Sequence, residues 1–362
     1  MNKVTVAVLF GGVSSEHEVS LLSAKSVIDN IPRDRYDVLM LGITKEGRWL
    51  LFSGDTAALP DGSWEQDAGN VEAFLSPDAT MRGIIKKANG AVIPVDVVFP
   101  VLHGANGEDG TMQGLLTLAR IPFVGCGCAS SAVCMDKMFQ KCVLDAAGIR
   151  QAKWTYADIG EYRQEPGALL DRVEESLGYP VFVKPANAGS SVGISKAHDR
   201  AELESAVEKA AVHDRKLVFE ETVVGQEIEC AVLGNGDPFI SCCGEILPCN
   251  EFYDYDAKYL AGKTGLAIPA HLSEEKALEV RQTAKMAYLL LGCSGLTRMD
   301  FFVRSSDGAV LLNEPNTIPG FTAISMYPKL FAASGISYKE LLDRLMMLAL
   351  EKAGAVKQPS AV

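Results

Sequence analysis

The sequence has no apolar run that approaches the ~20 residues of a membrane-spanning helix. Its first residues, MNKVTVAVLFGG, lack the long apolar core and the cleavage site of a signal peptide, and they predict a first strand instead. Positive charge is also scarce, because 34 Lys and Arg stand against 46 Asp and Glu and give a net charge of −12. With no Lys/Arg cluster as a local exception, general nucleic-acid binding and a membrane partner are not expected.

Zinc-binding cysteine motifs are absent as well. The chain has nine cysteines, but Cys126-Gly-Cys128 and Cys242-Cys243 have neither zinc-ligand spacing nor a histidine close by. We expect reduced, buried thiols in a cytosolic protein. The Gly-Gly turn after the first strand does not form the G-x-G-x-x-G pattern, which argues against a dinucleotide-dependent oxidoreductase.

With 362 residues and 48% apolar content, the chain can hold two or three domains. Its first third alternates strand and helix patterns, which predicts a parallel sheet with ligands at the carboxyl ends of its strands. Residues 53–90 interrupt this pattern and indicate a surface insertion, with strand-like pieces around Trp49 and Phe74. A single helix over 130–147 is expected to lead into a second unit, and a third unit begins near Glu227. The other predicted elements are strands at 4–10, 36–43, 95–102, 180–184, 216–221, 227–233 and 238–246, and helices at 18–30, 200–212 and 273–291.

Two short apolar runs near the C-terminus, joined by a Ser-Ser-Asp-Gly turn, predict a β-hairpin. Arg298 and Asp300 are two residues apart on the first run and therefore face the same side. Glu314 and Asn316 lie on the second run, and carboxylate and amide oxygens suit Mg²⁺ that carries a nucleotide phosphate. The hairpin is therefore interpreted as the floor of a phosphoryl-transfer site. Pro315 has no N–H, so its strand is expected at a sheet edge or with one ladder bond missing.

A Gly-Ser loop at 188–193 follows the apolar strand that ends in Lys184. Such a loop can aim N–H groups and hydroxyls at a phosphate, although many are only turns, and this one is not a Walker A sequence. An ammonium group at the end of an apolar strand is costly to bury unless an anion pairs with it. The two features together favour a phosphate site.

Three other polar segments each allow a functional and a structural interpretation. The carboxylates of 220–227 can bind adenine and ribose, or form a solvated acidic turn. His103 can hydrogen-bond a substrate carboxylate, or form a structural cap through Nδ1. Residues 252–259, with Lys258, can close over a reacting centre and exclude water, or form an ordinary amphipathic surface.

With these residues in view, the chain resembles the D-alanine–D-alanine ligases of the ATP-grasp superfamily over nearly its whole length. Seven motifs in compatible order carry the resemblance. They are FGGVSSEHEVS (10–20), LHGANGEDGTMQG (102–114), MDK (135–137), VKPANAGSSVGISK (183–196), EFYDYDAKY (251–259), RMD (298–300) and NEPNTIPGFT (313–322).

The resemblance implies a three-domain α/β ATP-grasp ligase. It implies an N-terminal parallel-sheet substrate-binding domain over 1–136 and two α+β lobes that clamp ATP. The central lobe would span 137–226, and the C-terminal lobe 227–362 would carry the metal site and a mobile loop at 250–268. A cytoplasmic homodimer, built largely through the N-terminal domain, would supply a peptidoglycan precursor.

The mechanism that the resemblance implies has two steps. ATP phosphorylates the carboxylate of a first D-alanine; the amine of a second D-alanine then attacks the acyl phosphate, and a tetrahedral intermediate loses phosphate. The implied substrate-positioning and oxyanion residues are Glu16, His103, Ser190, Tyr259, Arg298, Gly320 and Ser325. The implied ATP-binding residues are Lys137, Lys184, Ser190, Ser191, Glu220, Glu221, Val223, Glu227 and Lys258. The implied ligands of two Mg²⁺ or Mn²⁺ ions are Asp300, Glu314 and Asn316.

Two rival functions remain open at this point. A vancomycin-resistance-type relative would join D-alanine to D-serine or D-lactate. The D-lactate version typically lacks the tyrosine-lysine segment, so an intact 252–259 favours an amine acceptor but discriminates D-serine weakly. The pair Ala323-Ile324 replaces a more polar pair beside the second-substrate serine. A non-catalytic nucleotide-binding regulator is disfavoured by the complete set of metal ligands, lysines and arginine.

Overall fold

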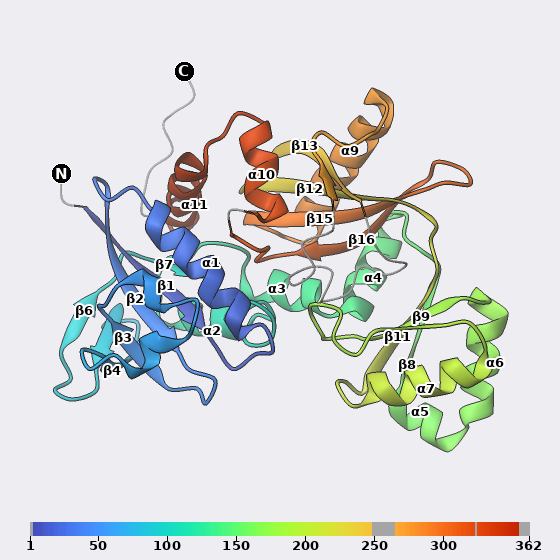
Figure 1. The fold of residues 1–362 in the computed structure, drawn as a ribbon, viewed down its shortest axis with the longest axis horizontal. Coiled ribbons are helices and arrows are strands. Elements are labelled where there is room, and N and C mark those ends of the chain that lie inside the picture. Colours follow the sequence, from blue (N-terminus) through green and yellow to red (C-terminus); the bar gives the residue numbers. More distant parts are fainter. Residues whose placement is uncertain (1–2, 248–264, 323, 355–362) are drawn as a thin grey trace.

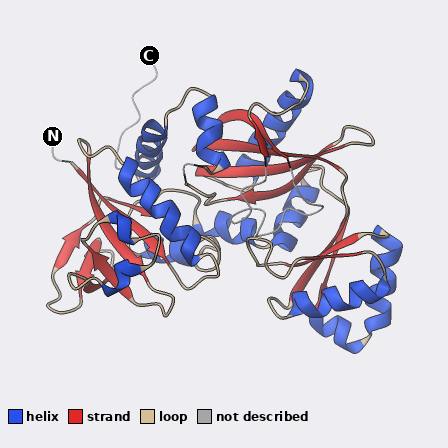
Figure 2. Cartoon of the chain, viewed as in Figure 1, coloured by secondary structure: helices blue, strands red, loops and turns tan. Residues whose placement is uncertain are grey.

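Three β-sheets, each with its own helices, make up the computed structural model, which describes residues 3–247, 265–322 and 324–354 (Figures 1 and 2). In Figure 1 the N-terminal unit (blue to cyan) lies at one end and the central unit (green to yellow) at the other. The C-terminal unit (yellow to red) lies between and above them. The predicted division of the chain at 136 and 226 stays a prediction.

The N-terminal unit is a seven-stranded sheet with the order β6-β5-β4-β3-β2-β1-β7. Strand β1 runs parallel to both β2 and β7, which confirms the predicted parallel core, but β3 to β6 extend the sheet in antiparallel fashion. The strand-like pieces predicted around Trp49 and Phe74 are therefore strands of this sheet, and residues 53–90 form part of the sheet as well as its surface. The elements are β1 (Val4–Gly11), α1 (His17–Asn30), β2 (Tyr36–Ile43), β3 (Trp49–Phe52), the 3-10 turns η1 (Thr56–Ala58) and η2 (Ser63–Gln66), β4 (Val71–Leu75), β5 (Gly83–Lys86), β6 (Val92–Pro94), β7 (Val97–Pro100) and α2 (Thr111–Leu118).

The single helix predicted over 130–147 is two helices, α3 (Cys128–Met135) and α4 (Lys137–Ala146). The break lies at Asp136, whose carboxylate accepts hydrogen bonds from the N–H groups of Met138 and Phe139 at 3.1 Å each. An aspartate that caps a helix satisfies N–H groups that have no partner within the helix, so Asp136 ends one helix and begins the next.

The central unit is an antiparallel sheet with the order β10-β9-β11-β8 and helices on one face (Figure 1). Alternate residues of its strands face these helices, and a compact apolar core that includes Val183, Leu203 and Phe219 forms between the two layers. The elements are β8 (Trp154–Asp158), α5 (Ile159–Gln164), α6 (Pro166–Leu177), β9 (Val181–Pro185), β10 (Ser195–Ala197), α7 (Arg200–Ala211) and β11 (Lys216–Glu221).

The C-terminal unit is an antiparallel sheet with the order β14-β13-β12-β15-β16. It contains the predicted hairpin as β15 and β16. Strand β16 lies at the sheet edge, as predicted from the missing N–H of Pro315. Pro315 stands opposite Met299 of β15. Ser337 caps the last helix, because its Oγ accepts the Glu340 N–H at 3.3 Å. The elements are β12 (Gly225–Gly234), β13 (Phe239–Leu247), β14 (Gly265–Ala267), α9 (Glu274–Leu290), β15 (Gly295–Arg304), β16 (Val310–Asn316), α10 (Met326–Ala333) and α11 (Tyr338–Lys352).

The N-terminal and C-terminal units share one apolar core. Helix α11 packs against α1 and β7, so that Leu345 belongs to the same buried cluster as Val8 and Phe99. At the edge of this contact, Tyr36 Oη donates to Asp343 at 2.6 Å. The two ends of the sequence are therefore joined by packing.

The eight described cysteines are all free. Five are buried as predicted, but Cys128 and Cys142 are exposed and Cys242 is half-buried, so the expectation fails for these three. Within the described ranges, none of the helices combines the length and the apolar character needed to cross a membrane.

Candidate active site

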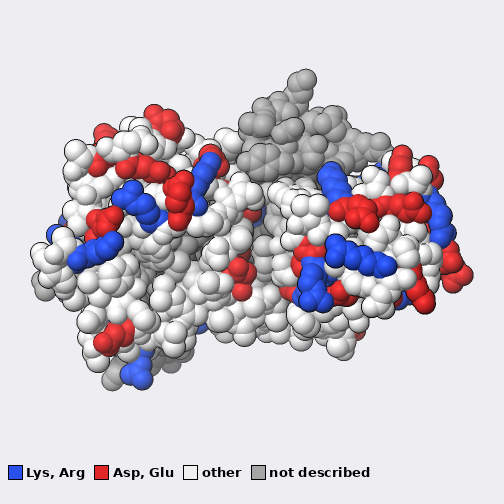
Figure 3. Space-filling model, turned by 90° about the horizontal axis from the view of Figure 1, so that it is seen from below, with Lys and Arg blue, Asp and Glu red and all other residues white. Residues whose placement is uncertain are grey.

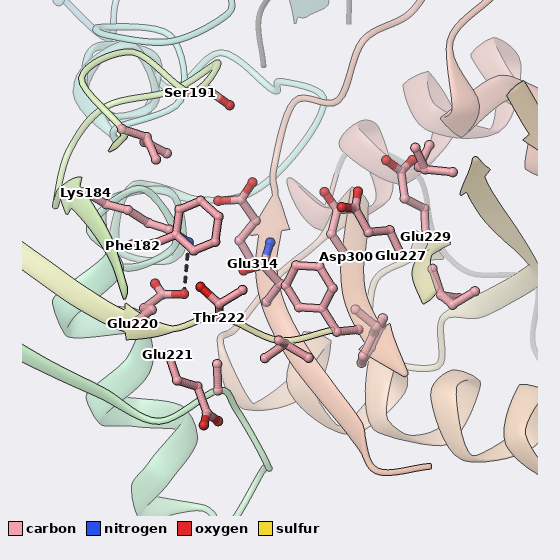
Figure 4. A pocket seen from close by; sticks show the side chains of 18 of the residues that line it. Phe182, Lys184, Ser191, Glu220, Glu221, Thr222, Glu227, Glu229, Asp300 and Glu314 are labelled. Atoms are coloured by element: carbon pink, nitrogen blue, oxygen red, sulfur yellow. Dashed lines mark hydrogen bonds and ion pairs between the residues drawn. The ribbon is translucent and has the colours of Figure 1, made fainter. Parts of the chain in front are cut away.

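A polar pocket lies between the central and C-terminal sheets (Figure 4). Strands β9 and β11 contribute Lys184 and Glu220 to one wall. The facing wall comes from the hairpin, where Asp300 and Glu314 point into the same space. Apolar side chains, among them Phe182, complete the lining, so the pocket offers both a flat hydrophobic surface and charged ends.

The hairpin floor follows from strand register. Asp300 of β15 stands opposite Glu229 of β12 on one side and opposite Glu314 of β16 on the other. Arg298, two residues earlier, stands opposite Asn316. Residues that face each other across neighbouring strands project to the same face, as do residues two apart on one strand. Three carboxylates, an amide and a guanidinium therefore gather on one face, as the sequence predicted for four of the five.

Arg298 is held by two carboxylates. Its Nε and Nη2 donate to the two oxygens of Asp300 at 2.7 Å each, and Nε lies 3.0 Å from Glu229 Oε2. Burial alone would lower the pKa of Arg298, but Asp300 and Glu229 raise it well above its ordinary value. Arg298 is therefore a permanently charged donor fixed in direction.

The predicted metal ligands occur together but already make contacts within the protein. Asn316 Nδ2 donates to Asp300 Oδ2 at 2.8 Å, and Asp300 also accepts from Arg298. Among the residues that the structure describes, no group of three or more His, Cys, Asp or Glu is arranged around a common metal position. The donor set of Asp300, Glu314 and Asn316 nevertheless fits Mg²⁺ in kind, because all three carry hard oxygens on adjacent positions of one face.

Two lysines compensate one buried glutamate on the opposite wall. Lys184 Nζ lies 2.9 Å from Glu220 Oε2, and Lys141 Nζ lies 3.4 Å from Glu220 Oε1. Burial would raise the pKa of Glu220, but Lys141 and Lys184 lower it to about 2. We expected an anion beside Lys184, and in this structure Glu220 is that anion.

Other predicted nucleotide-binding residues surround this pair. Ser191, Glu221, Val223 and Glu227 all line the pocket. Lys137, the first residue of α4, donates from Nζ to the carbonyl of Ala188 at 2.8 Å and lies 3.8 Å from Glu314 Oε2. Lys137 therefore connects the Gly-Ser loop with the hairpin floor.

The Gly-Ser loop reaches the N-terminal unit through Ser190, whose hydroxyl donates to Glu16. Ser190 and Ser191 have φ of 47° and 60°, a left-handed backbone that costs energy for residues other than glycine. Two glycines permit the close approach to Glu16, since a Cβ at Gly104 or Gly189 would lie 2.6 or 2.7 Å from Glu16 Oε2. The predicted contact between Glu16 and Ser190 thus depends on three separate segments.

His103 is buried with both ring nitrogens engaged. Its Nδ1 lies 3.0 Å from the carbonyl of Ile318, and its Nε2 lies 2.9 Å from Ser23 Oγ. This geometry matches the structural cap that the sequence left open as one alternative, and its role beside a D-alanine carboxylate stays a prediction. Burial lowers the pKa of His103, which favours the neutral ring.

Glu108 is a half-buried carboxylate in the same segment. Its two oxygens accept the N–H groups of Gly104 at 2.7 Å and of Ile318 at 3.2 Å. Burial and the charge of Glu16 raise the pKa of Glu108 to about 8, although these N–H groups oppose the shift. This raised pKa favours the protonated form of Glu108 beside Glu16.

The predicted second-substrate serine begins α10. Ser325 Oγ accepts the N–H of Thr322 at 3.0 Å and lies close to Gly320, where a Cβ would come within 3.0 Å of it. Ser325 and Gly320 are therefore neighbours at the end of the loop that follows β16. The remaining predicted residues, Lys258 and Tyr259, lie outside the described residues.

Comparison with known proteins places the chain in a family. The family models described as "D-ala D-ala ligase N-terminus" and "D-ala D-ala ligase C-terminus" match residues 5–126 and 143–347. The chain belongs to the D-alanine–D-alanine ligase family.

Curated members of this family share about half of their residues with the chain. The D-alanine--D-alanine ligase of Caldicellulosiruptor bescii is 51% identical over 354 residues, which are 97% of this chain and 96% of the relative. The D-alanine--D-alanine ligase of Acetivibrio thermocellus is 50% identical over 364 residues, with 97% of each chain covered.

Two solved structures share the fold. The VanG D-Ala:D-Ser ligase from Enterococcus faecalis has a TM-score of 0.88 and 39% identity, covering 96% of this chain and all (100%) of that one. The D-alanine-D-alanine ligase from Coxiella burnetii has a TM-score of 0.85 and 35% identity, covering 98% and 97%. The three-domain ATP-grasp fold expected from the sequence is thereby confirmed.

Three residues in or directly behind the pocket were missed by the sequence reasoning. Glu229 stands beside Arg298, Lys141 lies behind Glu220, and Phe182 forms an apolar wall. A signal was available for Glu229, because Glu227 and Glu229 are two positions apart at the start of β12 and therefore face the same side. Lys141 follows Lys137 by one helical turn, and that spacing places both on one face of α4.

Proposed function

We propose that the chain joins two D-alanine molecules in an ATP-dependent reaction and yields D-alanyl-D-alanine, ADP and phosphate. The observation that carries the proposal is the pocket between two sheets, with lysines on one wall and an arginine-carboxylate floor on the other, in a chain about 50% identical to curated D-alanine--D-alanine ligases. Such a site has the charges of both signs needed to bind a polyphosphate and two zwitterions.

In the first step, the carboxylate of one D-alanine attacks the γ-phosphorus of ATP and ADP leaves. In this proposal Lys137 and Lys184 neutralise phosphate oxygens, as lysines do in many phosphoryl-transfer sites. Phe182 and the segment 220–223 surround the adenine, while Glu227 receives the ribose hydroxyls. Ser191 directs the Gly-Ser loop toward the phosphates, and Lys258 reaches the transferred group.

Divalent metal ions would be held by Asp300, Glu314 and Asn316. Bound there, two Mg²⁺ or Mn²⁺ ions would shield the negative charge of the phosphates and polarise the γ-phosphoryl group.

In the second step, the amine of the second D-alanine attacks the acyl phosphate. The C–N bond forms, the carbonyl oxygen becomes an oxyanion, and phosphate leaves as the carbonyl is restored. We assign the oxyanion donors to Arg298 and the Gly320 N–H, the first ammonium group to Glu16, and the second carboxylate to Ser325. Ser190 and Tyr259 extend the hydrogen-bonded set at Glu16, with His103 nearby.

Product analysis with competing acceptors tests the proposal. The protein is incubated with ATP, Mg²⁺ and D-alanine, alone or with D-serine or D-lactate, and the product masses are measured. We expect the D-alanine dipeptide to dominate in every mixture. The structural likeness to a D-Ala:D-Ser ligase makes D-serine the second candidate, and a dominant mixed dipeptide would establish it instead. No release of phosphate with D-alanine would favour a nucleotide-binding regulator.

The proposal also includes a cytoplasmic homodimer that acts on small molecules. Acidic and basic side chains are interspersed over both ends of the face shown in Figure 3, which supports small-molecule substrates over nucleic acid. Light scattering of the purified protein measures the oligomeric state, and a monomer at micromolar concentration would contradict the dimer.

A further inference from the structure

The loop between β16 and α10, which carries Gly320, is held from the N-terminal unit on both sides of that glycine. On one side, the Ile318 N–H donates to Glu108 Oε1 at 3.2 Å and the Ile318 carbonyl accepts from His103 Nδ1 at 3.0 Å. On the other side, the Phe321 N–H donates to Ser23 Oγ at 3.4 Å. The segment 318–321 is thus fixed at its two ends by side chains that are distant in sequence.

The hydrogen bonds have one consistent direction. His103 Nδ1 must carry the proton, since its partner is a carbonyl, and Nε2 must then accept from Ser23 Oγ at 2.9 Å. With its proton committed to His103, the Ser23 hydroxyl is an acceptor toward the Phe321 N–H. The Ser23 and His103 side chains are both buried, so water does not compete for these bonds. A chain of hydrogen bonds therefore connects the Phe321 N–H, through Ser23 and His103, to the Ile318 carbonyl.

Glu108 connects this loop with the Glu16 pocket. Its second oxygen accepts the Gly104 N–H at 2.7 Å, and Gly104 is one of the two glycines packed against the Glu16 carboxylate. A displacement of Ile318 would therefore be transmitted to the place assigned to the first D-alanine. The loop with the oxyanion donor and the pocket for the first substrate share one hydrogen-bonded support.

We propose that Ser23, His103 and Glu108 are positioning residues that aim the Gly320 N–H at the developing oxyanion, so that the N-terminal unit completes the site for C–N bond formation. The inference rests on the proposed function, because it assigns these residues to the second step of that reaction. Preorganised donors act only when their direction is fixed before the charge develops, and a loop glycine between two tethered peptides meets that condition.

Ser23→Ala tests the proposal, because it removes the acceptor for Phe321 and the donor for His103 together. Ser130→Ala is the matched control, since it deletes another buried serine hydroxyl that donates only to sulfur, at 3.5 Å from Cys293 Sγ. We expect Ser23→Ala to lower kcat about 10- to 100-fold while the KM for ATP stays within about twofold. Binding of a phosphinate dipeptide analogue, whose tetrahedral phosphorus mimics the intermediate, should weaken by the same factor.

Hydrogen exchange separates this inference from the proposed function. In Ser23→Ala the amides of Ile318, Gly320 and Phe321 should exchange faster than in the wild type, whether or not the protein ligates D-alanine. Unchanged exchange, or unchanged kcat and phosphinate affinity in the folded variant, would overturn the positioning role. Glu108→Gln keeps one acceptor oxygen but replaces the other with an NH₂ group, so it should lose less activity than Glu108→Leu, which removes both acceptors. Equal losses in both would also contradict the inference. A wild type that releases no phosphate with D-alanine would refute the proposed function alone.

Discussion

Two neighbouring carboxylates set the orientation of the Arg298 side chain. The carboxylates of Asp300 and Glu229 fix its guanidinium at 2.7 and 3.0 Å, so its charge is directed before any substrate arrives. Arg298→Ala should therefore reduce kcat by about 10² or more, the usual effect of removing one oxyanion donor, while the protein remains folded. Phosphate release and a melting curve measure the two effects. Arg344→Ala, which removes an exposed arginine from α11, is the control, and wild-type turnover in Arg298→Ala would exclude Arg298 from the mechanism.

Lys141 lies behind the pocket, with 1% of its side chain exposed and its ammonium 3.4 Å from Glu220. Lys141→Met should lower the free energy of unfolding by about 3 kcal/mol, because breaking a buried pair leaves charge less well compensated. The matched control is Lys285→Met, whose ammonium pairs with Asp237 at the surface and should cost no more than about 1 kcal/mol. Urea denaturation of both variants measures the difference. Equal stability losses would show that the burial of Lys141 carries no special weight.

The residues that the sequence predicted and those that it missed differ in a physical way. Arg298, Asp300, Glu314 and Asn316 could be placed on one face because strand alternation is a local property of the hairpin. Lys141 depends on a contact between α4 and β11, and its partner Glu220 lies 79 positions away in the sequence. Local patterns report which way a side chain points, but not which distant group it will meet.

At the scale of elements, the break between α3 and α4 matters most for the pocket. Apolar periodicity runs through 130–147 and predicts one helix, but Asp136 satisfies the first N–H groups of α4 and also pairs with Lys216 of β11. The apolar periodicity of a segment cannot predict this ion pair, because Lys216 is distant in the sequence. The break makes Lys137 the first residue of a new helix, where its side chain reaches the Gly-Ser loop.

Asp136→Ala should lower the free energy of unfolding by about 2 kcal/mol, near the upper end for the loss of a helix cap. The KM for ATP should rise as well, because Lys137 would no longer be held at the first position of a capped helix. Asp136→Asn keeps an oxygen for the Met138 and Phe139 N–H groups but not the charge that faces Lys216, and we expect about half the loss of stability. Urea denaturation and ATP titration measure the two quantities. An Asp136→Ala variant with unchanged KM would separate the helix break from nucleotide binding.

At the scale of the whole molecule, the sequence predicted three units, but it did not predict which units contribute to the same apolar core. The core of the central unit contains only residues of that unit, whereas one of the two cores of the N-terminal sheet is shared with α10 and α11 at the other end of the sequence. The amphipathic pattern of α11 shows that one face is buried, but that pattern is the same whichever sheet covers it. Only the structure shows that the N-terminal and C-terminal units pack against each other through a shared apolar core.

Leu345→Ala and Leu203→Ala test this division with the same chemical change, since both leucines are fully buried but belong to different cores. Each should cost about 2–5 kcal/mol. Because Val6 and Val8 of β1 and Leu233 of β12 belong to the same cluster as Leu345, Leu345→Ala should accelerate amide exchange in both strands. Leu203→Ala should accelerate exchange in β9 and β11 and leave β1 unchanged. If Leu345→Ala instead affected only α10 and α11, the N-terminal and C-terminal units would be shown to unfold independently.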